Sequence, residues 1–424
     1  MQFRTQLGGY ALRPNLLCIG GEDHSLRIPF LLALRDKGFT VSAAGTGSPE
    51  PFARAGIDYH AFELTRFFDP FADWATFKSI RKLIANLRPS VVQCFDTKLN
   101  LLVPLAAKGD PDVRVVSTIN GLGWLYSSNS PSALCLRPVF RGLQKLANRA
   151  TATTIFQNQD DQTFYRRHRL VNRGSEMLIP SSGIDIKKFE RDIANGKSPA
   201  EIRMTLGLGA CEVVLTVTRL TRQKGVPTLL KAAALVHKKR PGVRFLLVGP
   251  RENEGPLAVA LSEIERHASY VTYLGPRGDV PSLLAAADVF AFPTELREGV
   301  PRVLLEASAA GCPIVTTSTP GCTDVVKEGW NGFTVEPFSP QLLAEKILTL
   351  LDDRNTAALM GRRAASFVRE KFSLELTVAR YSAVYEKLLA NDAVTSGPVI
   401  DARTIQDRIN TRRPSHYDVP QISE

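Results

Sequence analysis

Glu298 and Glu306 are the two side chains of this 424-residue sequence whose types and spacing most clearly suggest chemistry. They lie eight positions apart in DVFAFPTELREGVPRVLLEASAAG, where an apolar run passes through a short polar loop into a helical pattern. A carboxylate accepts hydrogen bonds in pairs and therefore suits the vicinal hydroxyls of a ribose or a hexose. The two glutamates can thus engage different parts of one extended ligand. The alternative is that both only favour the positive end of a helix dipole.

A diphosphate site is suggested by the elements around these glutamates. Pro301 suits the first turn of the helix that carries Glu306, and Gly311 ends it. Because this helix begins just after a strand-like run, its free N–H groups can bind a diphosphate. Arg219 and Lys224 follow another such run, EVVLTV, and two cations at a strand end suit the same ligand. Solvated cations on a loop are the ordinary alternative.

Gly20 and Gly21 form a third, weaker element directly after the first apolar run, NLLCI. Missing side chains let backbone N–H groups come close to a ligand, although two glycines in a turn often only make the turn. Their spacing is not the GxGxxG fingerprint, and no acidic ribose ligand follows about 20 residues later. A dehydrogenase is therefore disfavoured.

The elements that must position these residues follow an alternating pattern. Short β-branched runs alternate with helical stretches in both halves of the chain, and the pattern restarts near residue 212. Such alternation predicts an α/β protein with parallel sheets covered by helices. Parallel sheets bind ligands beyond the carboxyl ends of their strands, where all three elements lie. The stretch 186–212 lacks a strand pattern and is the expected linker.

We therefore predict two Rossmann-like, doubly wound domains that face each other across a cleft. The predicted ranges are 1–188 and 189–370, followed by a helix at 371–390 that packs back toward the first domain. From Asn391 to the end, residues 391–424 have a mixed polar composition typical of a disordered tail.

The net charge of +11 is concentrated in the first half, where residues 1–185 hold 22 Lys+Arg against 15 Asp+Glu. Nucleic acid, an acidic membrane or a phosphorylated substrate would all suit such a field. The N-terminus does not resemble a signal peptide and no apolar run could span a membrane, so a cytoplasmic protein is expected. The six cysteines are scattered and are expected to be small buried hydrophobes.

Residues 131–175 combine cations with apolar residues and only two acids, Asp160 and Asp161. Such a surface could rest on anionic lipid, while a solvated helix face is the alternative. The cations are Arg137, Arg141, Lys145, Arg149, Arg166, Arg167, Arg169 and Arg173.

The segments EGVPRVLLEASAAGCPIV and TRLTRQKG resemble the E-x7-E region and the Arg/Lys diphosphate element of family 4 glycosyltransferases, which have the GT-B fold. The resemblance covers roughly residues 14–390. The segments TKLNLL, INGLGW, FQNQDD, PSSGIDIKKF and PGCTDVVKEGWNGF are most similar to those of bacterial enzymes that extend a sugar on undecaprenyl diphosphate.

The resemblance implies a retaining transferase that moves a sugar from a nucleotide diphosphate, a UDP-linked hexose or N-acetylhexosamine, to a lipid-diphosphate-linked saccharide in surface polysaccharide biosynthesis. The first domain would bind the acceptor and the second the donor, at the inner face of the cytoplasmic membrane. We expect no nucleic-acid partner. Because Arg219, Lys224 and the helix N-terminus can balance the leaving group's charge, we also expect no metal or other cofactor.

The resemblance also assigns roles to single residues. Arg219 and Lys224 would hold the diphosphate, and Glu306 the ribose hydroxyls. Glu298 would hold the transferred sugar and is, with the two cations, the expected catalytic set. The remaining donor contacts would come from Gly299, Val300 and Pro301 beside Glu298, and from Gly20 and Gly21 of the opposite domain.

Two segments depart from the family pattern. Where many members have a His-rich turn, this chain reads CFDTKLN, so Asp96, Lys98 and Asn100 are the expected acceptor-side residues, together with Asn120 of INGLGW. Thr323-Asp324 replaces an Arg-Glu pair after PGC, which weakens the case for sugar or phosphate contacts there. The alternatives are a soluble acceptor, a nucleotide-sugar epimerase of the same architecture, or a binding protein without catalysis.

Overall fold

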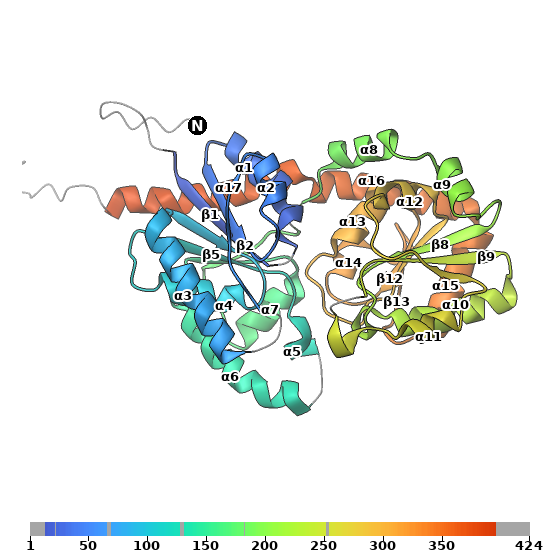
Figure 1. The fold of residues 1–424 in the computed structure, drawn as a ribbon, viewed down its shortest axis with the longest axis horizontal. Coiled ribbons are helices and arrows are strands. Elements are labelled where there is room, and N and C mark those ends of the chain that lie inside the picture. The colour runs from blue at the N-terminus through green and yellow to red at the C-terminus, as the bar shows by residue number, and fades with distance from the viewer. Residues whose placement is uncertain are drawn as a thin grey trace, which may run out of the picture. The chain divides into compact units, whose positions relative to one another are not determined.

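The computed structural model describes residues 13–21, 23–65, 69–127, 131–181, 183–251 and 254–395. Within these ranges strands and helices alternate along the chain, from β1 to the long final helix α17 (Figure 1). The strands form two sheets in which every pair of neighbouring strands is parallel.

The first sheet has seven strands in the order β3-β2-β1-β4-β5-β6-β7. Its strands are β1 (Asn15–Gly20), β2 (Thr40–Gly45), β3 (Asp58–Ala61), β4 (Val91–Cys94), β5 (Arg114–Ile119), β6 (Thr153–Phe156) and β7 (Glu176–Leu178). The connecting helices are η1 (His24–Arg27), α1 (Ile28–Asp36), α2 (Glu50–Arg54), α3 (Pro70–Leu87), α4 (Leu99–Ala107), α5 (Gly123–Ser127), α6 (Pro131–Asn148) and α7 (Gln159–Arg167).

The second sheet has six strands in the order β10-β9-β8-β11-β12-β13. Its strands are β8 (Glu212–Val217), β9 (Val243–Val248), β10 (Val271–Tyr273), β11 (Val289–Phe292), β12 (Ile314–Thr317) and β13 (Phe333–Val335). The accompanying helices are α8 (Ile186–Asn195), α9 (Pro199–Thr205), η2 (Arg222–Lys224), α10 (Val226–Lys239), η3 (Gly255–Leu257), α11 (Leu261–Glu265), α12 (Val280–Ala286), α13 (Arg302–Ala309), α14 (Cys322–Val325), α15 (Pro340–Asp352), α16 (Arg354–Phe372) and α17 (Leu374–Thr395).

Both sheets have the doubly wound strand order of a Rossmann fold, so the predicted α/β class with two parallel sheets is confirmed. In each sheet the order reverses at one place, between β1 and β4 in the first and between β8 and β11 in the second. Ligands of such sheets bind beyond the carboxyl ends of the strands at this reversal. The two reversals are therefore where a site is expected.

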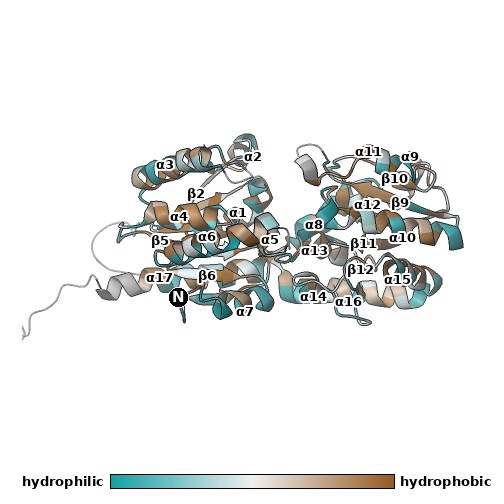
Figure 2. Cartoon of the chain, turned by 90° about the horizontal axis from the view of Figure 1, so that it is seen from below, coloured by the Kyte–Doolittle hydropathy of each residue, from teal (hydrophilic) through white to brown (hydrophobic). Residues whose placement is uncertain are grey.

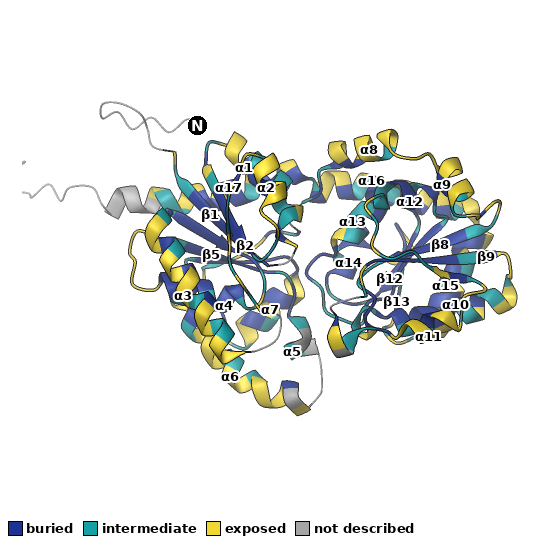
Figure 3. Cartoon of the chain, in the orientation of Figure 1, coloured by how far each residue is buried: buried dark blue, intermediate teal, exposed yellow. Residues whose placement is uncertain are grey.

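The second sheet is buried on both faces because its strand residues alternate between two apolar layers. Val213 packs in a cluster with Leu304 of α13, whereas its neighbour Val214 packs with Leu229 of α10 and Ile347 of α15. Figure 3 shows the central strands of both sheets buried beneath partly exposed helices. This core fixes the strand ends from which the functional loops start.

The first sheet packs in the same way against α3 and α4. Leu17 and Val92 lie in a cluster with Ile80 of α3 and with Leu99 and Val103 of α4. Figure 2 shows α4 as a largely apolar helix, which agrees with its burial. Tyr381 of α17 also contacts this part of the chain, through Phe30 and the Thr118 hydroxyl.

Three expectations from the sequence are corrected. The stretch 186–212 contains α8 and α9 rather than only a linker, since Asp185 and Ser198 cap their N-termini. Pro301 is the N-cap of α13 and lies just outside the helix. The predicted tail begins within α17, which continues to Thr395 because no proline or glycine interrupts it before Gly397. Residues 396–424 lie outside the described residues.

Candidate functional site

Lys224 and Glu298 form an ion pair at the strand-order reversal of the second sheet. Lys224 ends η2, which follows β8, and Glu298 lies in the loop after β11, the strand paired with β8. Both side chains are largely buried, and the Thr294 hydroxyl donates to the same carboxylate oxygen at 3.0 Å. The fold thus brings together one predicted cation and one predicted carboxylate.

Arg219 follows the same strand but has a different partner. Its guanidinium contacts the carboxylate of Glu254 at 3.1 Å, and the Glu254 side chain is only 5% exposed. Arg219 remains more than one-third exposed, which leaves part of its guanidinium open to a ligand. Glu254 was not predicted, because it lies in a polar segment without a motif.

Glu306 lies in the second turn of α13, where Arg302 donates to its carboxylate at 2.8 Å. Arg302 also donates to the Leu26 carbonyl at 3.0 Å, from a segment 276 residues away. Pro301 supplies no side-chain acceptor to the first turn of α13, so the first N–H groups of the helix have no cap there. Glu298 and Glu306 therefore have separate sets of neighbours.

The backbone beside Glu298 is already hydrogen-bonded at two positions. The Glu298 N–H donates to the Pro320 carbonyl at 3.2 Å, and the Val300 N–H donates to Oε1 of Gln157 at 3.1 Å. Pro301 has no N–H. Of the backbone donors predicted for the sugar, Gly299 is the one without a hydrogen bond among the described contacts.

Gly20 is the last residue of β1 and Gly21 follows it, at the strand-order reversal of the first sheet. The Gly21 N–H donates to Asp96 at 2.7 Å, and Asp96, after β4, has a positive φ of 74°. Gly20 must lack a side chain because a Cβ would lie 2.2 Å from Nδ1 of His24. His24 is fully buried, and burial lowers its pKa to about 3, so the imidazole is neutral at ordinary pH.

The other predicted acceptor-side residues have different surroundings. Lys98 pairs with Asp73 and donates to the Thr65 carbonyl at 2.7 Å. Asn100 is 2% exposed and donates to the Thr118 carbonyl at 2.8 Å, which fixes it inside the first sheet. Asn120 has a buried Oδ1 without a hydrogen-bond partner.

Gln157, Asn158 and Asp161 contact the loop of Glu298 and were not predicted. They follow β6, whose four residues TTIF are too short to stand out as a strand in the sequence. If that strand had been recognised, the segment FQNQDD would have been expected at the carboxyl end of a strand, where ligands of parallel sheets bind. Asp324 instead accepts the Gly321 N–H at 3.0 Å, so this departure from the family pattern has a structural role.

Two family models match this chain, "Glycosyl transferase 4-like" over residues 16–159 and "Glycosyl transferases group 1" over residues 211–353. Together they cover more than half of the sequence. The chain belongs to glycosyltransferase family 4.

Two curated relatives of this glycosyltransferase act on undecaprenyl-linked saccharides. It is 27% identical to the N,N'-diacetylbacillosaminyl-diphospho-undecaprenol alpha-1,3-N-acetylgalactosaminyltransferase of Campylobacter jejuni, over 88% of this chain and 97% of that protein. It is 25% identical to the UDP-Gal:alpha-D-GlcNAc-diphosphoundecaprenol alpha-1,3-galactosyltransferase of Escherichia coli, over 77% of this chain and 83% of that one.

Solved structures give the same fold. A crystal structure of Anabaena HepE in complex with UDP and glucose matches with a TM-score of 0.71 at 21% identity, and covers 88% of this chain and 100% of that one. The GT-B architecture that the resemblance implies is therefore present in this glycosyltransferase.

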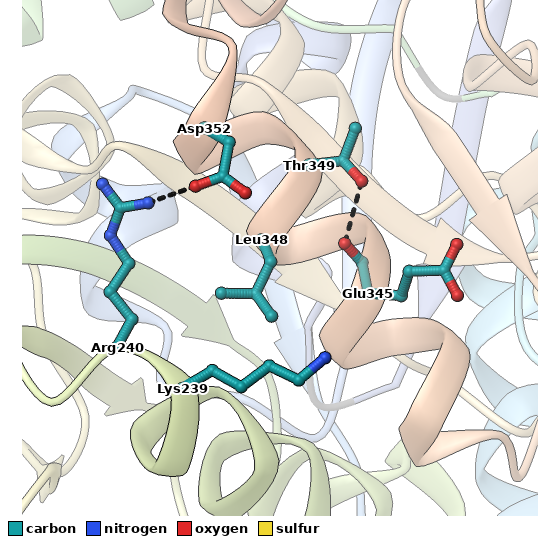
Figure 4. Close-up of a pocket in the computed structure, with 6 residues that line it drawn as sticks. All are labelled: Lys239, Arg240, Glu345, Leu348, Thr349 and Asp352. Carbon is teal, nitrogen blue, oxygen red and sulfur yellow. Dashed lines mark hydrogen bonds and ion pairs between the residues drawn. The ribbon is translucent and has the colours of Figure 1, made fainter.

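Two surface hollows of the glycosyltransferase lie away from Glu298. Arg240 reaches across the first to Asp352, between the end of α10 and α15 (Figure 4). Because α10 runs from the end of β8 back to the start of β9, this hollow lies where the strands of the sheet begin. Glu298 lies where they end. The second hollow, of about 910 Å³, is lined by Arg166, Arg167, Arg169, Val171, Asn172, Arg173 and Glu176.

The described residues contain no group of three or more His, Cys, Asp or Glu side chains that could hold a metal ion. No helix in the same part of the chain is both long and apolar enough to cross a bilayer.

Proposed function

We propose that this glycosyltransferase moves a hexose or an N-acetylhexosamine, with retention of configuration, from UDP to a saccharide linked to a lipid diphosphate. The observation that carries this proposal is the Lys224–Glu298 pair at the strand-order reversal of the second sheet. A lysine in this position is suited to bind a diphosphate, and the carboxylate beside it is suited to accept sugar hydroxyls. The names of the two undecaprenyl-dependent relatives support the lipid-linked acceptor.

The donor would bind along the second sheet, in the proposed donor domain 189–370, with 1–188 receiving the acceptor. Lys224 and Arg219 would bind the diphosphate, and Glu306 would accept the ribose hydroxyls. A diphosphate beside Lys224 competes with Glu298 for the ammonium, which releases the carboxylate toward the sugar. The same two cations would stabilise the charge of the departing nucleotide, without a requirement for a metal.

The acceptor side would face an anionic membrane. Helix α6 exposes the apolar side chains Leu134, Leu136, Val139 and Leu143 between its cations. The arginine-lined hollow after α7 carries one carboxylate, Glu176, which pairs with Arg166. Such a surface favours phosphate headgroups and supports a peripheral place at the inner face of the cytoplasmic membrane.

The test is a screen of UDP-sugars and GDP-sugars with purified protein and a synthetic lipid-diphosphate monosaccharide, with and without a chelator. We expect one UDP-sugar to give a longer glycolipid of retained configuration, at a rate that the chelator does not change. Slow epimerisation of a donor with no new glycolipid from any of them would reject the transfer. Loss of all activity with chelator would reject the metal-independent mechanism alone.

A further inference from the structure

Two amide side chains at the carboxyl end of β6 contact the loop that carries Glu298. Oε1 of Gln157 accepts the Val300 N–H at 3.1 Å, and Nδ2 of Asn158 donates to the Glu298 carbonyl at 3.0 Å. Gln157 is 4% exposed and Asn158 is 1% exposed. The two hydrogen bonds hold the peptide groups on either side of Gly299.

The amide of Asn158 is itself held in one orientation. Its Oδ1 accepts the Asp161 N–H at 2.7 Å, which caps α7, and its Nδ2 also donates to the Asp161 carboxylate at 2.9 Å. Asp161 is fully buried and pairs with Arg297 at 3.1 Å. Side chains from a single turn after β6 therefore hold the loop at three of its residues, Arg297, Glu298 and Val300.

The packing around Gly299 leaves no room for a side chain between the loop and the segments that face it. A Cβ on Gly299 would lie 2.3 Å from Oε1 of Gln157 and 2.9 Å from the carbonyl carbon of Asn120. On the facing loop, a Cβ on Gly121 would lie 2.9 Å from the Gly299 nitrogen. Two glycines thus allow the backbones to approach as closely as the hydrogen bonds require.

We infer that Gln157 and Asn158 are positioning residues for Glu298. They fix its backbone, while Lys224 and Thr294 fix its carboxylate. This inference rests on the proposed function, in which Glu298 holds the transferred sugar. A displacement of about 1 Å in such a group can cost about a hundredfold in rate. The nucleotide contacts of Arg219 and Glu306 lie outside this network.

The test compares Gln157→Met and Asn158→Ser with the wild type. Met keeps the volume of Gln157 without its acceptor, and Ser keeps the N-cap of α7 but is too short to reach Glu298. We expect kcat to fall about 10- to 100-fold and the extra affinity for UDP-sugar over UDP to be lost. The Kd for UDP should stay within about threefold. Gln157→Glu keeps an acceptor oxygen and should recover part of kcat.

Asn331→Ser is the matched control. Asn331 is also a buried amide that accepts one backbone N–H, from Lys327, and donates to one carbonyl, of Val325. The substitution Asn331→Ser should lower the melting temperature at least as much as Asn158→Ser does. It should leave the preference for UDP-sugar over UDP unchanged. An equal loss of preference in the control would overturn the positioning role, because general destabilisation would then explain it.

Hydrogen exchange of the peptide 293–303 separates this inference from the proposed function, because it needs neither donor nor transfer. The Val300 amide should exchange at least tenfold faster in Gln157→Met than in the wild type. Unchanged exchange would reject the inference even if transfer is found. Faster exchange in a protein that transfers no sugar would reject the function and leave the inference standing.

Discussion

At the scale of single residues, the two glutamates of the E-x7-E segment have different surroundings. Glu298 is in the loop after β11 and pairs with Lys224, whereas Glu306 is in the second turn of α13 and pairs with Arg302. A ligand group bound by one carboxylate need not touch the other. The two residues should therefore contribute to different kinetic parameters.

We predict that Glu306→Gln raises the Kd for UDP and the KM for UDP-sugar together, by about tenfold, because each charge-assisted hydrogen bond contributes about 1.5–3 kcal/mol. Glu298→Gln should lower kcat by about a hundredfold and leave the Kd for UDP nearly unchanged. Titration calorimetry with UDP and initial rates of transfer provide the two measurements. A common change in UDP affinity for both variants would contradict the division of roles.

The sequence was sufficient to predict site residues that follow apolar strands and belong to a family motif. Lys224 and Glu298, which follow β8 and β11, are examples. It was insufficient for Gln157 and Asn158, because their role depends on contacts about 140 residues away in the chain. No local pattern distinguishes an amide that caps a helix from one that also reaches a distant carbonyl.

At the scale of elements, the strands within clear apolar or β-branched runs were predictable, including the short strands β4, β10, β11 and β12, whereas other short strands were not. β3, β7 and β13 have three or four residues and include polar ones, so their periodicity is too brief to detect. These strands lie at or next to the edges of their sheets. The candidate site lies at the ends of the central strands, so its main residues could be predicted without the edge strands.

The loop between β11 and α13 should tolerate no added side chain at Gly299. We predict that Gly299→Ala lowers transfer at least tenfold, because its Cβ would overlap with Gln157 and with the Asn120 backbone. Gly142→Ala in α6 is the control, since a Cβ there would meet no atom within 4 Å. This control should be neutral or stabilise by about 0.5–1 kcal/mol. Full activity of Gly299→Ala would show that the loop can move away from β6.

Asp161 at the start of α7 should give the molecule a measurable pH dependence. Burial raises its pKa to about 6, although Asn158 and Arg297 hydrogen-bond its ionised form. Because the folded-state pKa exceeds the ordinary value, ionisation costs stability above pH 6, and that cost disappears as the pH falls toward 4.

The difference in melting temperature, wild type minus Asp161→Asn, should therefore increase as the pH is lowered from 7 to 4. Below pH 4 it should stay constant. Comparing the two proteins cancels the titration of all other groups that they share. A difference that falls over this range would mean that the ionised carboxylate with Arg297 is the stabilised form.

At the scale of the whole molecule, most of the net positive charge lies in the first half of the chain, which contains the proposed membrane-facing surface. We predict that the protein sediments with vesicles of 30% phosphatidylglycerol at 0.1 M salt, and much less with neutral vesicles or at 0.5 M salt. Reversing Arg167, Arg169 and Arg173 to Glu should weaken binding by at least about a hundredfold, because the loss of three cations at about 1 kcal/mol each already gives that factor and the new carboxylates repel anionic lipid.

A matched set of substitutions tests whether position or total charge matters. The matched set changes the net charge by the same amount on α10, a helix that packs against the second sheet. It consists of Lys231→Glu, Lys238→Glu and Lys239→Glu. These changes should leave vesicle binding nearly intact. Equal losses in both sets would indicate a non-specific effect of net charge.

The distribution of the cysteines offers a probe for this surface. Four thiols are buried, and burial raises the pKa of Cys94 to about 12 and of Cys322 to about 11, so they exist almost entirely as unreactive thiols at neutral pH. Cys135, which was expected to be buried, is instead exposed on α6, beside the apolar side chains Leu134 and Leu136. A polarity-sensitive fluorophore attached there would shift to shorter emission wavelengths as the helix enters lipid, so the native sequence already carries the labelling position that a real-time binding assay requires.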